Sequence, residues 1–473
     1  MYFDKNYINN KFLQYACNTK NKISIFPYRK YIFKHEILWI RSKCAFIAPN
    51  ILLILLFLLN EKNPCGIITA TLNSACLIKS KGDLIMSRKI TFGIIGVGNM
   101  GSSHMRSFME GKLPELELTA VADINPERLE WAKEQLPNIS VFNTASELIH
   151  SGKCEAIVIA TPHYDHPPIA IEALKAGLHV MTEKPAGVYT KQVREMIEVA
   201  SQTDRTFAIM FNQRTNVVYR KLRELVQNGE YGEIRRVNWI ITDWFRTQAY
   251  YDSGGWRATW AGEGGGVLIN QCPHNLDLWQ WICGMPNKIW ATCHQGKWHN
   301  IEVEDDVTIY AEYPNGATGV FIATTGDCPG TNRLEITMDK AKIVCENNEI
   351  KLYVLDESIS KFTYEAKLGF AKLKGQYVDV EITGESTHHP GVLNAFAANI
   401  LRGEPLYAHG SEGINSLMIS NAAYLSSWLG RPVELPLDED LFYEELKKRI
   451  ESSNAKKEVK AQVQEDMSST YGS

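Results

Sequence analysis

Three glycines that follow a short apolar run near residue 90 constrain the fold of this chain more than any other feature. The run Ile90–Ile95 predicts a buried strand, and residues 102–111 predict the helix that follows it. Gly96, Gly98 and Gly101 lie between the two in the pattern G-x-G-x-x-G. Such a pattern alone occurs in many loops, but between a strand and a helix it is typical of a unit that binds a dinucleotide.

Each residue of this fingerprint has a predicted role at the phosphates of the dinucleotide. Gly96 allows a tight turn, Gly98 lets the backbone approach the pyrophosphate, and Gly101 lets the helix pack closely on the strand. Asn99 and Met100 lie at the helix start, where free N–H groups and partial positive charge attract phosphates. We therefore expect all five residues to bind the cofactor.

An aspartate at the end of the next apolar run indicates which dinucleotide binds. Asp123 follows the run 118–122, at the interval of about 20 residues that dinucleotide-binding folds use. Its carboxylate is expected to accept hydrogen bonds from the ribose hydroxyls and to repel a 2′-phosphate, and neither Ile124 nor Asn125 would bind one. NAD is therefore favoured over NADP. The alternative is a structural turn with an unrelated aspartate.

The composition is that of an ordinary globular protein of two or three domains. The 473 residues are 45% apolar and 22% charged, with a formal net charge of −4. This near-neutral balance gives no electrostatic reason to expect nucleic acid as a partner, and no Cys/His spacing indicates a metal site. The ten cysteines include no Cys-x-x-Cys pair, which favours reduced thiols and a cytoplasmic protein.

Residues 1–86 differ from the rest of the chain, and two interpretations of them stay open. They are rich in Asn, Lys, Ile, Tyr and Phe, and they show no domain-like periodicity. We prefer the hypothesis that they are not part of the native protein, which would then start at Met86. In the alternative, the apolar residues within 37–59 anchor the chain in a membrane, although Arg41 and Lys43 interrupt them.

Two domains are predicted for the remaining chain, and the first spans residues 87–212. Short apolar runs alternate there with amphipathic helical stretches, a pattern typical of a parallel sheet with helices on both faces. Six strands fit a doubly wound α/β fold, whose ligand binds beyond the C-terminal ends of the strands. The predicted strands are Ile90–Ile95, 118–122, Ser140–Phe142, 156–160, 178–181 and 207–211.

The second predicted domain, residues 213–450, has an α+β pattern with an open, largely antiparallel sheet. Helices at Pro273–Cys283, 390–402 and 412–429 are expected to cover one face of this sheet, and the other face is expected to form an oligomer interface. The polar residues 451–473 are predicted to be a disordered tail. The predicted strands are 234–244, 288–294, 307–313, 318–325, 333–338 and 342–345.

A lysine follows the fifth predicted strand of the first domain, within the triplet Glu183-Lys184-Pro185. Strand ends face the cofactor crevice in this fold, so Lys184 is placed to reach a ligand. A lysine there can hydrogen-bond a substrate oxygen and relay its proton, with a pKa lowered by burial and by neighbouring positive charge. A solvated loop lysine is the alternative interpretation.

A histidine near the start of a predicted helix is the second candidate acid or base. The glycine run 264–266 permits close backbone approach, and Pro273 suits the first turn of the helix. The positive end of the helix dipole disfavours an imidazolium at His274, so this side chain suits proton transfer near neutral pH. Packing or capping at the helix start is the alternative.

Three features together resemble the Gfo/Idh/MocA family (glucose–fructose oxidoreductase and inositol dehydrogenase): the fingerprint with Asp123, the Glu-Lys-Pro triplet and the glycine-rich segment before His274. The resemblance covers residues 88–450. It implies a Rossmann domain, then an open-sheet domain that mediates homodimers or homotetramers. It also implies a sugar, cyclitol or related polyol as substrate, NAD or NADP as cofactor, and an active site lined by Lys184 and His274.

The same resemblance assigns further cofactor contacts. Thr161, Pro162 and His163 follow the fourth predicted strand and are similar to the family segment that touches the cofactor. Glu183 and Lys184 are expected to lie at the cofactor as well.

One position departs from the family pattern. Many family dehydrogenases carry an aspartate four residues before the histidine, and this chain has Asn270 there. Asparagine can orient a substrate hydroxyl, but it brings no negative charge to the lysine. Trp256 and Arg257, with Trp260 nearby, offer a stacking surface and a polar clamp for a sugar ring, although packing is an equal alternative for them.

The resemblance implies an oxidoreductase that moves a hydride between a carbinol carbon and nicotinamide. Lys184 would handle the hydroxyl proton, His274 would act as the partner acid or base, and Asn270 would orient the substrate. Two alternatives stay open. One is an NAD-dependent glycosidase or epimerase that works by transient oxidation. The other is a non-catalytic module that senses NAD or sugar, which would need neither Lys184 nor His274.

Overall fold

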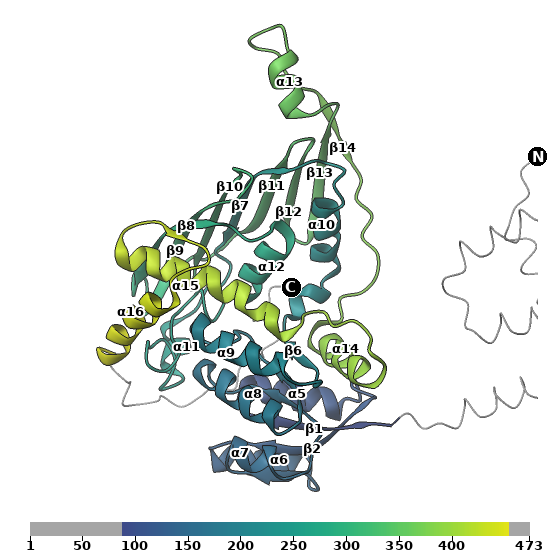
Figure 1. The fold of residues 1–473 in the computed structure, drawn as a ribbon, viewed down its shortest axis with the longest axis vertical. Coiled ribbons are helices and arrows are strands. Elements are labelled where there is room, and N and C mark those ends of the chain that lie inside the picture. Colours follow the sequence, from purple (N-terminus) through teal and green to yellow (C-terminus); the bar gives the residue numbers. More distant parts are fainter. Residues whose placement is uncertain (1–87, 454–473) are drawn as a thin grey trace, which may run out of the picture. The chain divides into compact units, whose positions relative to one another are not determined.

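The computed structural model describes residues 88–453, and these residues contain two sheets (Figure 1). The predicted extension 1–86 lies outside the described residues, as does the predicted tail from residue 454 onward. The parallel sheet and the mixed, largely antiparallel sheet that the sequence predicts are confirmed. The domain boundaries themselves stay predictions.

The first sheet is parallel throughout and has the strand order β3-β2-β1-β4-β5-β6. The chain runs outward from β1 to β3 and then returns to place β4 on the other side of β1. Ligands of doubly wound sheets bind at this reversal, beyond the C-terminal ends of the strands. The strands are β1 (Ile90–Ile95), β2 (Leu116–Ala122), β3 (Ser140–Phe142), β4 (Ala156–Ile159), β5 (His179–Thr182) and β6 (Phe207–Ile209).

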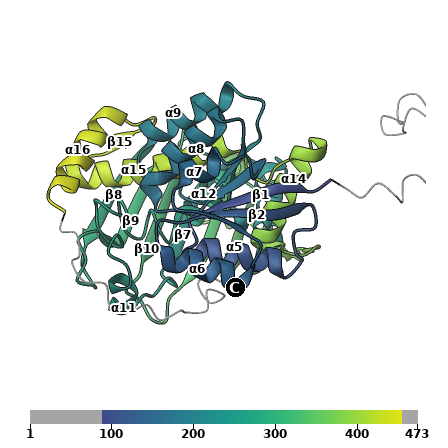
Figure 2. The same ribbon diagram turned by 90° about the horizontal axis from the view of Figure 1, so that it is seen from below.

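Helices cover both faces of this sheet. In Figure 2, α7, α8 and α9 lie on one side of β1 and β2, while α5 and α6 lie on the other. This placement follows from the strands, whose side chains are buried in two separate hydrophobic clusters, one on each face. The helices are α5 (Asn99–Met109), α6 (Pro126–Gln135), α7 (Ala145–Ile149), α8 (His166–Lys175) and α9 (Thr190–Ser201).

One helix lies against a different sheet from the one predicted. The apolar side of α14 (His388–Arg402) packs on the first sheet, where Phe396 meets the ring of Phe92 at 6.4 Å between centroids. Arg402 at its end pairs with Glu115 just before β2. The prediction that residues 390–402 cover the second sheet is therefore wrong, because an apolar helix stripe indicates burial without indicating the partner.

The second sheet has nine strands in the order β14-β13-β12-β11-β7-β10-β9-β8-β15. All neighbours are antiparallel except β7 and β10, which are parallel. The sequence did not predict β13, β14 and β15. The strands are β7 (Ile234–Ile241), β8 (Lys288–Gln295), β9 (Glu304–Glu312), β10 (Thr318–Thr324), β11 (Asn332–Met338), β12 (Ala341–Glu346), β13 (Glu349–Leu355), β14 (Gly375–Val378) and β15 (Val433–Glu434).

One face of this sheet is covered and the other is open. On β9, Val307, Ile309 and Ala311 are buried, whereas Thr308 and Tyr310 between them are exposed. This alternation with period two is that of a half-buried strand. The buried face packs against α10 (Val217–Gln227), α12 (Pro273–Cys283) and α15 (Gly413–Leu429). Three further helices are α11 (Gln248–Asp252), α13 (Ile359–Glu365) and α16 (Glu439–Glu451), the last of which extends into the predicted tail.

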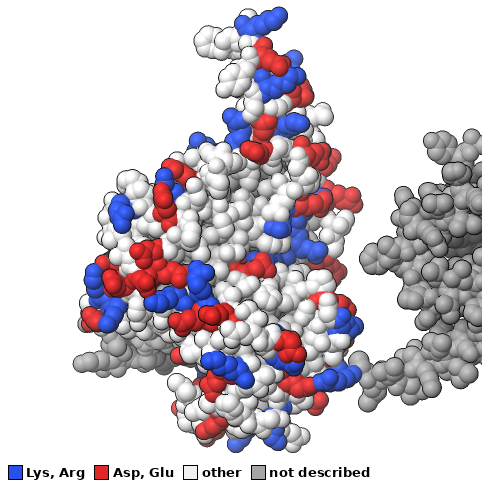
Figure 3. All heavy atoms as spheres, viewed as in Figure 1, with Lys and Arg blue, Asp and Glu red and all other residues white. Residues whose placement is uncertain are grey.

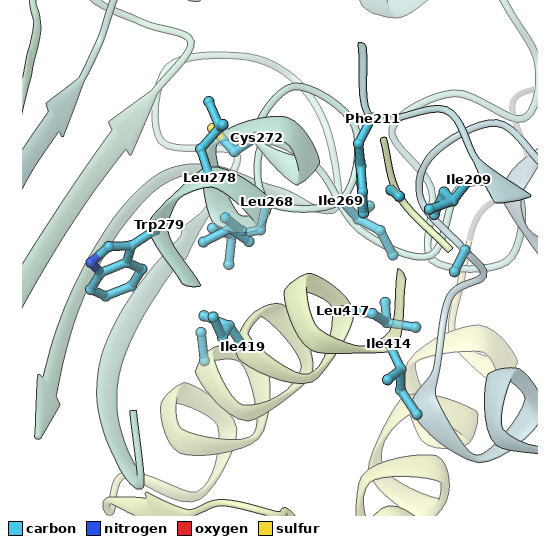
Figure 4. Close-up of a cluster of buried hydrophobic side chains, with 14 of the residues drawn as sticks. Ile209, Phe211, Leu268, Ile269, Cys272, Leu278, Trp279, Ile414, Leu417 and Ile419 are labelled. Atoms are coloured by element: carbon cyan, nitrogen blue, oxygen red, sulfur yellow. The ribbon is translucent and has the colours of Figure 1, made fainter. Parts of the chain in front are cut away.

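A continuous hydrophobic core joins the two sheets. Figure 4 shows Ile209 and Phe211 at the end of β6 beside Ile269 of the glycine-rich segment, with Ile414 and Leu417 of α15 below them. The buried side chains on one face of the parallel sheet belong to the same cluster as those of the second sheet. The C-terminal ends of the parallel strands are therefore fixed against the segment that carries the second half of the predicted site.

A buried carboxylate fixes the glycine turn of that segment. Glu304 at the start of β9 accepts hydrogen bonds from the backbone N–H groups of Gly266 (2.8 Å) and Leu268 (2.9 Å) and from the Tyr424 hydroxyl (2.7 Å). Burial raises the pKa of the Glu304 carboxyl to about 7, and these hydrogen bonds oppose the rise. A Cβ on Gly266 would lie 1.9 Å from the Glu304 carbonyl oxygen, so only glycine fits there.

No helix among residues 88–453 is long and apolar enough to cross a bilayer. The segment 37–59, for which the sequence offered a membrane anchor as an alternative, lies outside the residues that the structure describes.

Replacing Glu304 by Ala is expected to lower the free energy of unfolding by about 3 kcal/mol, because it leaves two N–H groups and a hydroxyl buried without an acceptor. Urea unfolding followed by circular dichroism measures this loss. The matched control is Glu365→Ala on the exposed helix α13, which should change the free energy by less than about 0.5 kcal/mol. Equal losses in the two variants would contradict the role of Glu304.

Candidate functional site

The turn between β1 and α5 has the geometry that its glycines predict. Gly96 has φ +91°, and a Cβ there would lie 2.7 Å from the carbonyl oxygen of Ala160. A Cβ on Gly101 would lie 1.8 Å from the carbonyl oxygen of Gly96, so the helix packs closely on the turn. A Cβ on Gly98 would meet no atom within 4 Å, which leaves that side of the turn open.

The start of α5 can receive an anion. Gly98 is its N-cap and makes no side-chain cap, and the first turn, which begins with Asn99 and Met100, contains no acidic residue. The N–H groups of such a first turn, together with the helix dipole, form an anion-binding position. The predicted phosphate-binding residues therefore lie together at one helix end.

Asp123 lies beside this turn at the end of β2. Its Oδ2 accepts a hydrogen bond from the Val97 N–H at 2.6 Å, and its Oδ1 accepts one from the Asn125 N–H at 2.8 Å. These bonds fix the carboxylate next to the glycine turn. Ile124, the adjacent residue, is 90% exposed.

The segment after β4 connects the first sheet to the glycine-rich segment. Thr161 has a buried hydroxyl without a hydrogen-bond partner among the described residues. Pro162 precedes the short helix η1 (His163–Asp165), in which the His163 Nδ1 lies 3.1 Å from the carbonyl oxygen of Glu263. The His163 and Trp256 rings meet edge to face, 5.9 Å apart, so a predicted cofactor residue contacts a predicted substrate residue.

A histidine of α5, the helix that follows β1, holds the Glu183 side chain in place. The His104 Nε2 of α5 lies 2.7 Å from Glu183 Oε1, and the Lys184 N–H donates to Oε2 at 3.2 Å. Burial alone would raise the pKa of Glu183, but the hydrogen bond and charge of His104, with His389 and Lys184, lower it to about 2. The carboxylate thus holds the loop that carries Lys184.

The Lys184 side chain reaches across to the second half of the site. Its Nζ donates a hydrogen bond to the backbone carbonyl oxygen of Asn270 at 2.9 Å. Burial lowers the pKa of Lys184 below its ordinary value, while the charges of Glu183 and Glu263 oppose this shift. A lowered pKa makes the uncharged amine, which can accept a proton, easier to reach.

His274 occupies the second position of α12, where the sequence predicts it. The side chain is buried, and its ring meets that of Phe211 edge to face at 6.2 Å between centroids. Burial, with the charges of Lys184 and His389, lowers the pKa of His274 well below its ordinary value, and only Glu183 opposes the shift. The structure therefore brings His274 within the electrostatic reach of Lys184.

Asn270 is surrounded by polar side chains that sequence reasoning missed. Its Nδ2 donates to Glu263 Oε1. Its Oδ1 accepts from the Tyr250 hydroxyl at 3.3 Å and from the Gln271 Nε2 at 3.2 Å. Glu263 directly precedes the glycine run, and an acidic residue beside a predicted tight turn could have indicated a site residue from the sequence alone. Nothing in the sequence connects Tyr250 with this segment.

Arg257 and Trp256 lie beside this group. The Arg257 guanidinium donates to the Tyr250 hydroxyl at 2.6 Å and lies over the rings of Tyr250 (4.4 Å) and Trp256 (4.8 Å). Its Nη1 is 3.7 Å from Glu263 Oε1. The Arg257 guanidinium and the rings of Tyr250 and Trp256 therefore form one stacked surface next to Asn270.

Two residues near the site have structural roles. Trp260 packs edge to face on the rings of Tyr424 and Trp428, so it belongs to the core and offers no sugar-stacking surface. Asp277 makes a buried two-bond ion pair with Arg214. Among residues 88–453, no group of three or more His, Cys, Asp or Glu side chains is arranged to hold a metal ion.

The comparisons with known proteins agree with these motifs. Residues 90–211 match the oxidoreductase family with an NAD-binding Rossmann fold, and residues 219–344 match the GFO/IDH/MocA C-terminal domain.

Two curated relatives and one solved structure illustrate the similarity. Myo-inositol 2-dehydrogenase of Thermotoga maritima is 24% identical over 352 residues, which cover 72% of this chain and 98% of that protein. D-glucoside 3-dehydrogenase of Escherichia coli K12 is 30% identical over 250 residues, which cover 49% of this chain and 68% of that protein. The WlbA dehydrogenase of Bordetella pertussis, solved with NADH and UDP-GlcNAcA, has a TM-score of 0.63 at 26% identity and covers 74% of this chain and 100% of that one. The chain therefore belongs to the Gfo/Idh/MocA family of NAD-binding oxidoreductases.

Proposed function

We propose that this protein transfers a hydride between a secondary hydroxyl carbon of a carbohydrate or polyol and NAD, with Lys184 taking up the hydroxyl proton. The observation that carries the proposal is the hydrogen bond from Lys184 Nζ to the Asn270 carbonyl oxygen at 2.9 Å. It joins the end of a parallel strand, where this fold binds its cofactor, to the segment that carries Asn270 and His274.

The residues around the β1–α5 turn fit NAD. The open side of Gly98 and the uncapped start of α5 suit a pyrophosphate, and the fixed carboxylate of Asp123 suits the ribose hydroxyls. The buried Thr161 hydroxyl has no partner among the described residues and would gain one from a bound ligand. When bound, NAD supplies the acceptor for the hydride.

The substrate class is supported by the site and by the relatives. The names of the two curated relatives place oxidation at carbon 2 of an inositol and at carbon 3 of a glucoside, both secondary carbinol carbons of a ring. In this chain, Arg257 and Trp256 supply the polar and aromatic groups that bind sugar rings, and Tyr250 and Asn270 supply hydrogen-bonding groups.

Lys184, His274 and Asn270 have different roles toward the substrate hydroxyl. Lys184, as an uncharged amine, accepts the hydroxyl proton as the carbinol carbon becomes a carbonyl carbon. Burial favours this amine form before reaction, and the charge of Glu263 stabilises the ammonium form afterwards. Burial lowers the pKa of His274, so its resting form is the neutral imidazole, which can act as the partner acid or base. Asn270 orients the hydroxyl.

The open face of the second sheet supports a homo-oligomer. Trp290 of β8 is 52% exposed and lies opposite Tyr310 of β9, which in turn lies opposite Val320 of β10. A row of apolar side chains across three strands is covered when two copies associate through this face.

The cysteines that the structure describes are free thiols, which supports a cytoplasmic location. In Figure 3, acidic and basic side chains lie side by side on the face shown.

Removing the charge of Asp123 is expected to weaken the preference for NAD over NADP. Asp123→Asn keeps an acceptor for the Val97 N–H but no longer repels a 2′-phosphate. The double variant Asp123→Asn with Ile124→Arg adds a cation beside it. Steady-state kinetics with both cofactors should give a ratio of kcat/KM for NADP to NAD that rises about tenfold or more, and further in the double variant. Glu134→Gln on α6 is the matched control, and an unchanged ratio in the double variant would contradict the role of Asp123.

Replacing Lys184 by Ala should abolish turnover while NADH still binds. General acid–base groups typically contribute about 100- to 10,000-fold to the rate. Oxidation of a panel of sugars, cyclitols and glycosides is followed by NADH absorbance, and NADH binding is followed by fluorescence. Lys175→Ala on α8 is the control and should leave the rate unchanged. Undiminished turnover in Lys184→Ala would refute the proton role, and release of free sugar without accumulation of NADH would indicate transient oxidation.

The oxidation rate should rise with pH because only the uncharged form of Lys184 accepts the proton. Burial, helped by Arg257, lowers the pKa of Lys184, and the charges of Glu183, Glu263 and Cys272 do not cancel this shift. The amine form is therefore lost as pH falls through a pKa below 10.5. A profile of kcat for oxidation against pH measures the inflection. An inflection at 10.5 or above would show that Lys184 is not the group that titrates.

A further inference from the structure

A buried carboxylate lies against Asn270, at the position where this chain departs from the aspartate of its family. Glu263 is 1% exposed and accepts a hydrogen bond from the Asn270 Nδ2. The site therefore contains a negatively charged group, the Glu263 carboxylate, which lies behind the Asn270 side chain. The following inference rests on the proposed function, since it concerns the same substrate hydroxyl.

The loop before the glycine run is shaped to hold this carboxylate. Ala258 has φ +56°, a conformation that non-glycine residues rarely adopt, and its N–H donates to Glu263 Oε2 at 2.5 Å. Gly262 allows the loop to close, because a Cβ there would lie 2.4 Å from the Trp256 carbonyl oxygen. Arg257 adds a cation at 3.7 Å. Both oxygens of Glu263 are thus occupied by donors, as an ionised carboxylate requires.

The Glu263 carboxylate also determines the orientation of the Asn270 side-chain amide. An ionised carboxylate only accepts hydrogen bonds, so the amide must direct its Nδ2 toward Glu263. The Oδ1 is then directed to the other side, where Tyr250 and Gln271 donate to it. The Gln271 Oε1 and the Arg257 Nε on that side are buried and have no partner among the described residues, which suits a polar ligand.

We propose that Glu263 is a positioning residue for the oxidation of the substrate: it locks the Asn270 amide so that Oδ1 faces the substrate as an acceptor, and it supplies the negative charge that an aspartate would have brought. Asn270 with Glu263 behind it then presents to a substrate hydroxyl the same acceptor oxygen as an aspartate. Glu263 faces Arg257 and Lys184: burial raises the pKa of its carboxyl, and the charges of these two neighbours oppose that rise.

Glu263→Gln should reverse the amide. The glutamine Oε1 still accepts from the Ala258 N–H, but its Nε2 then faces the Nδ2 of Asn270, and two donors cannot pair. The asparagine amide turns over and directs Nδ2 toward the substrate. A misplaced polar group of this kind costs about 100-fold in rate, so kcat should fall by that factor while the affinity for NADH is unchanged.

The double variant Glu263→Gln with Asn270→Asp should restore activity. The glutamine Nε2 now donates to the introduced aspartate carboxylate, which presents its other oxygen to the substrate, and the site regains one negative charge. We expect a kcat at least about tenfold above that of Glu263→Gln, the size of coupling found between residues in contact. Asn270→Asp alone places two carboxylates together and should be less active than the double variant.

Glu302→Gln is the matched control. Glu302 accepts a hydrogen bond from the Trp260 N–H of the same loop at 2.7 Å, whereas the Asn270 amide donates to Glu263. If Glu263 only held the loop, Glu302→Gln would lower kcat to a similar extent and the double variant would stay as inactive as Glu263→Gln. Either result overturns the proposal, as does a Glu263→Gln variant with native turnover.

Thermal unfolding without substrate separates this inference from the proposed function. The double variant should unfold at a higher temperature than the two single variants predict by addition, whether or not the protein oxidises sugars. If the native protein oxidises none, the proposed function fails while the amide pairing remains tested by this coupling. Additive unfolding temperatures would overturn the pairing itself. A single variant that does not fold, beside a double variant that does, shows the same coupling, because the second substitution then restores folding.

Discussion

The hydrogen bond between Lys184 Nζ and the Asn270 carbonyl oxygen is the constraint on which the site depends. Lys184 belongs to a loop of the parallel sheet, whereas Asn270 belongs to a segment of the second sheet's region. A lysine that spans them can act on a substrate only if both backbones are held in place, because a misplacement of about 1 Å can cost about 100-fold in rate. The buried pair of His104 and Glu183 fixes the first loop, and Glu304 fixes the second.

The charges around this bond explain how a buried lysine can work as a base. Burial lowers the pKa of Lys184 and so favours the amine, whereas the carboxylates of Glu183 and Glu263 limit how far the pKa falls. The neutral His274 adds no charge of its own. The site thus holds its carboxylates as hydrogen-bond acceptors from His104 and from Asn270, behind the groups that face a substrate.

Much of the fold was predictable because its signals are local. The glycine fingerprint, the alternating strands and the proline at the start of α12 each depend on a few neighbouring residues. The assignment of α14 was wrong because an apolar stripe records burial and not the sheet that buries it. Tyr250 was missed because its role depends on a contact between separate loops, whereas Glu263 was missed although an acid beside the glycine run was a usable signal. Lys184, Asn270 and His274 were singled out from their strand end, motif and helix start.

The central claim is that a hydride passes directly from a carbinol carbon of a carbohydrate or polyol to NAD. Substrates that carry deuterium on every carbon, such as a methyl glucoside or myo-inositol, test it most directly when the NADH that forms is analysed by mass spectrometry. The account predicts NADH that carries one deuterium and turnover slower than with the unlabelled substrate. NADH without deuterium would contradict it.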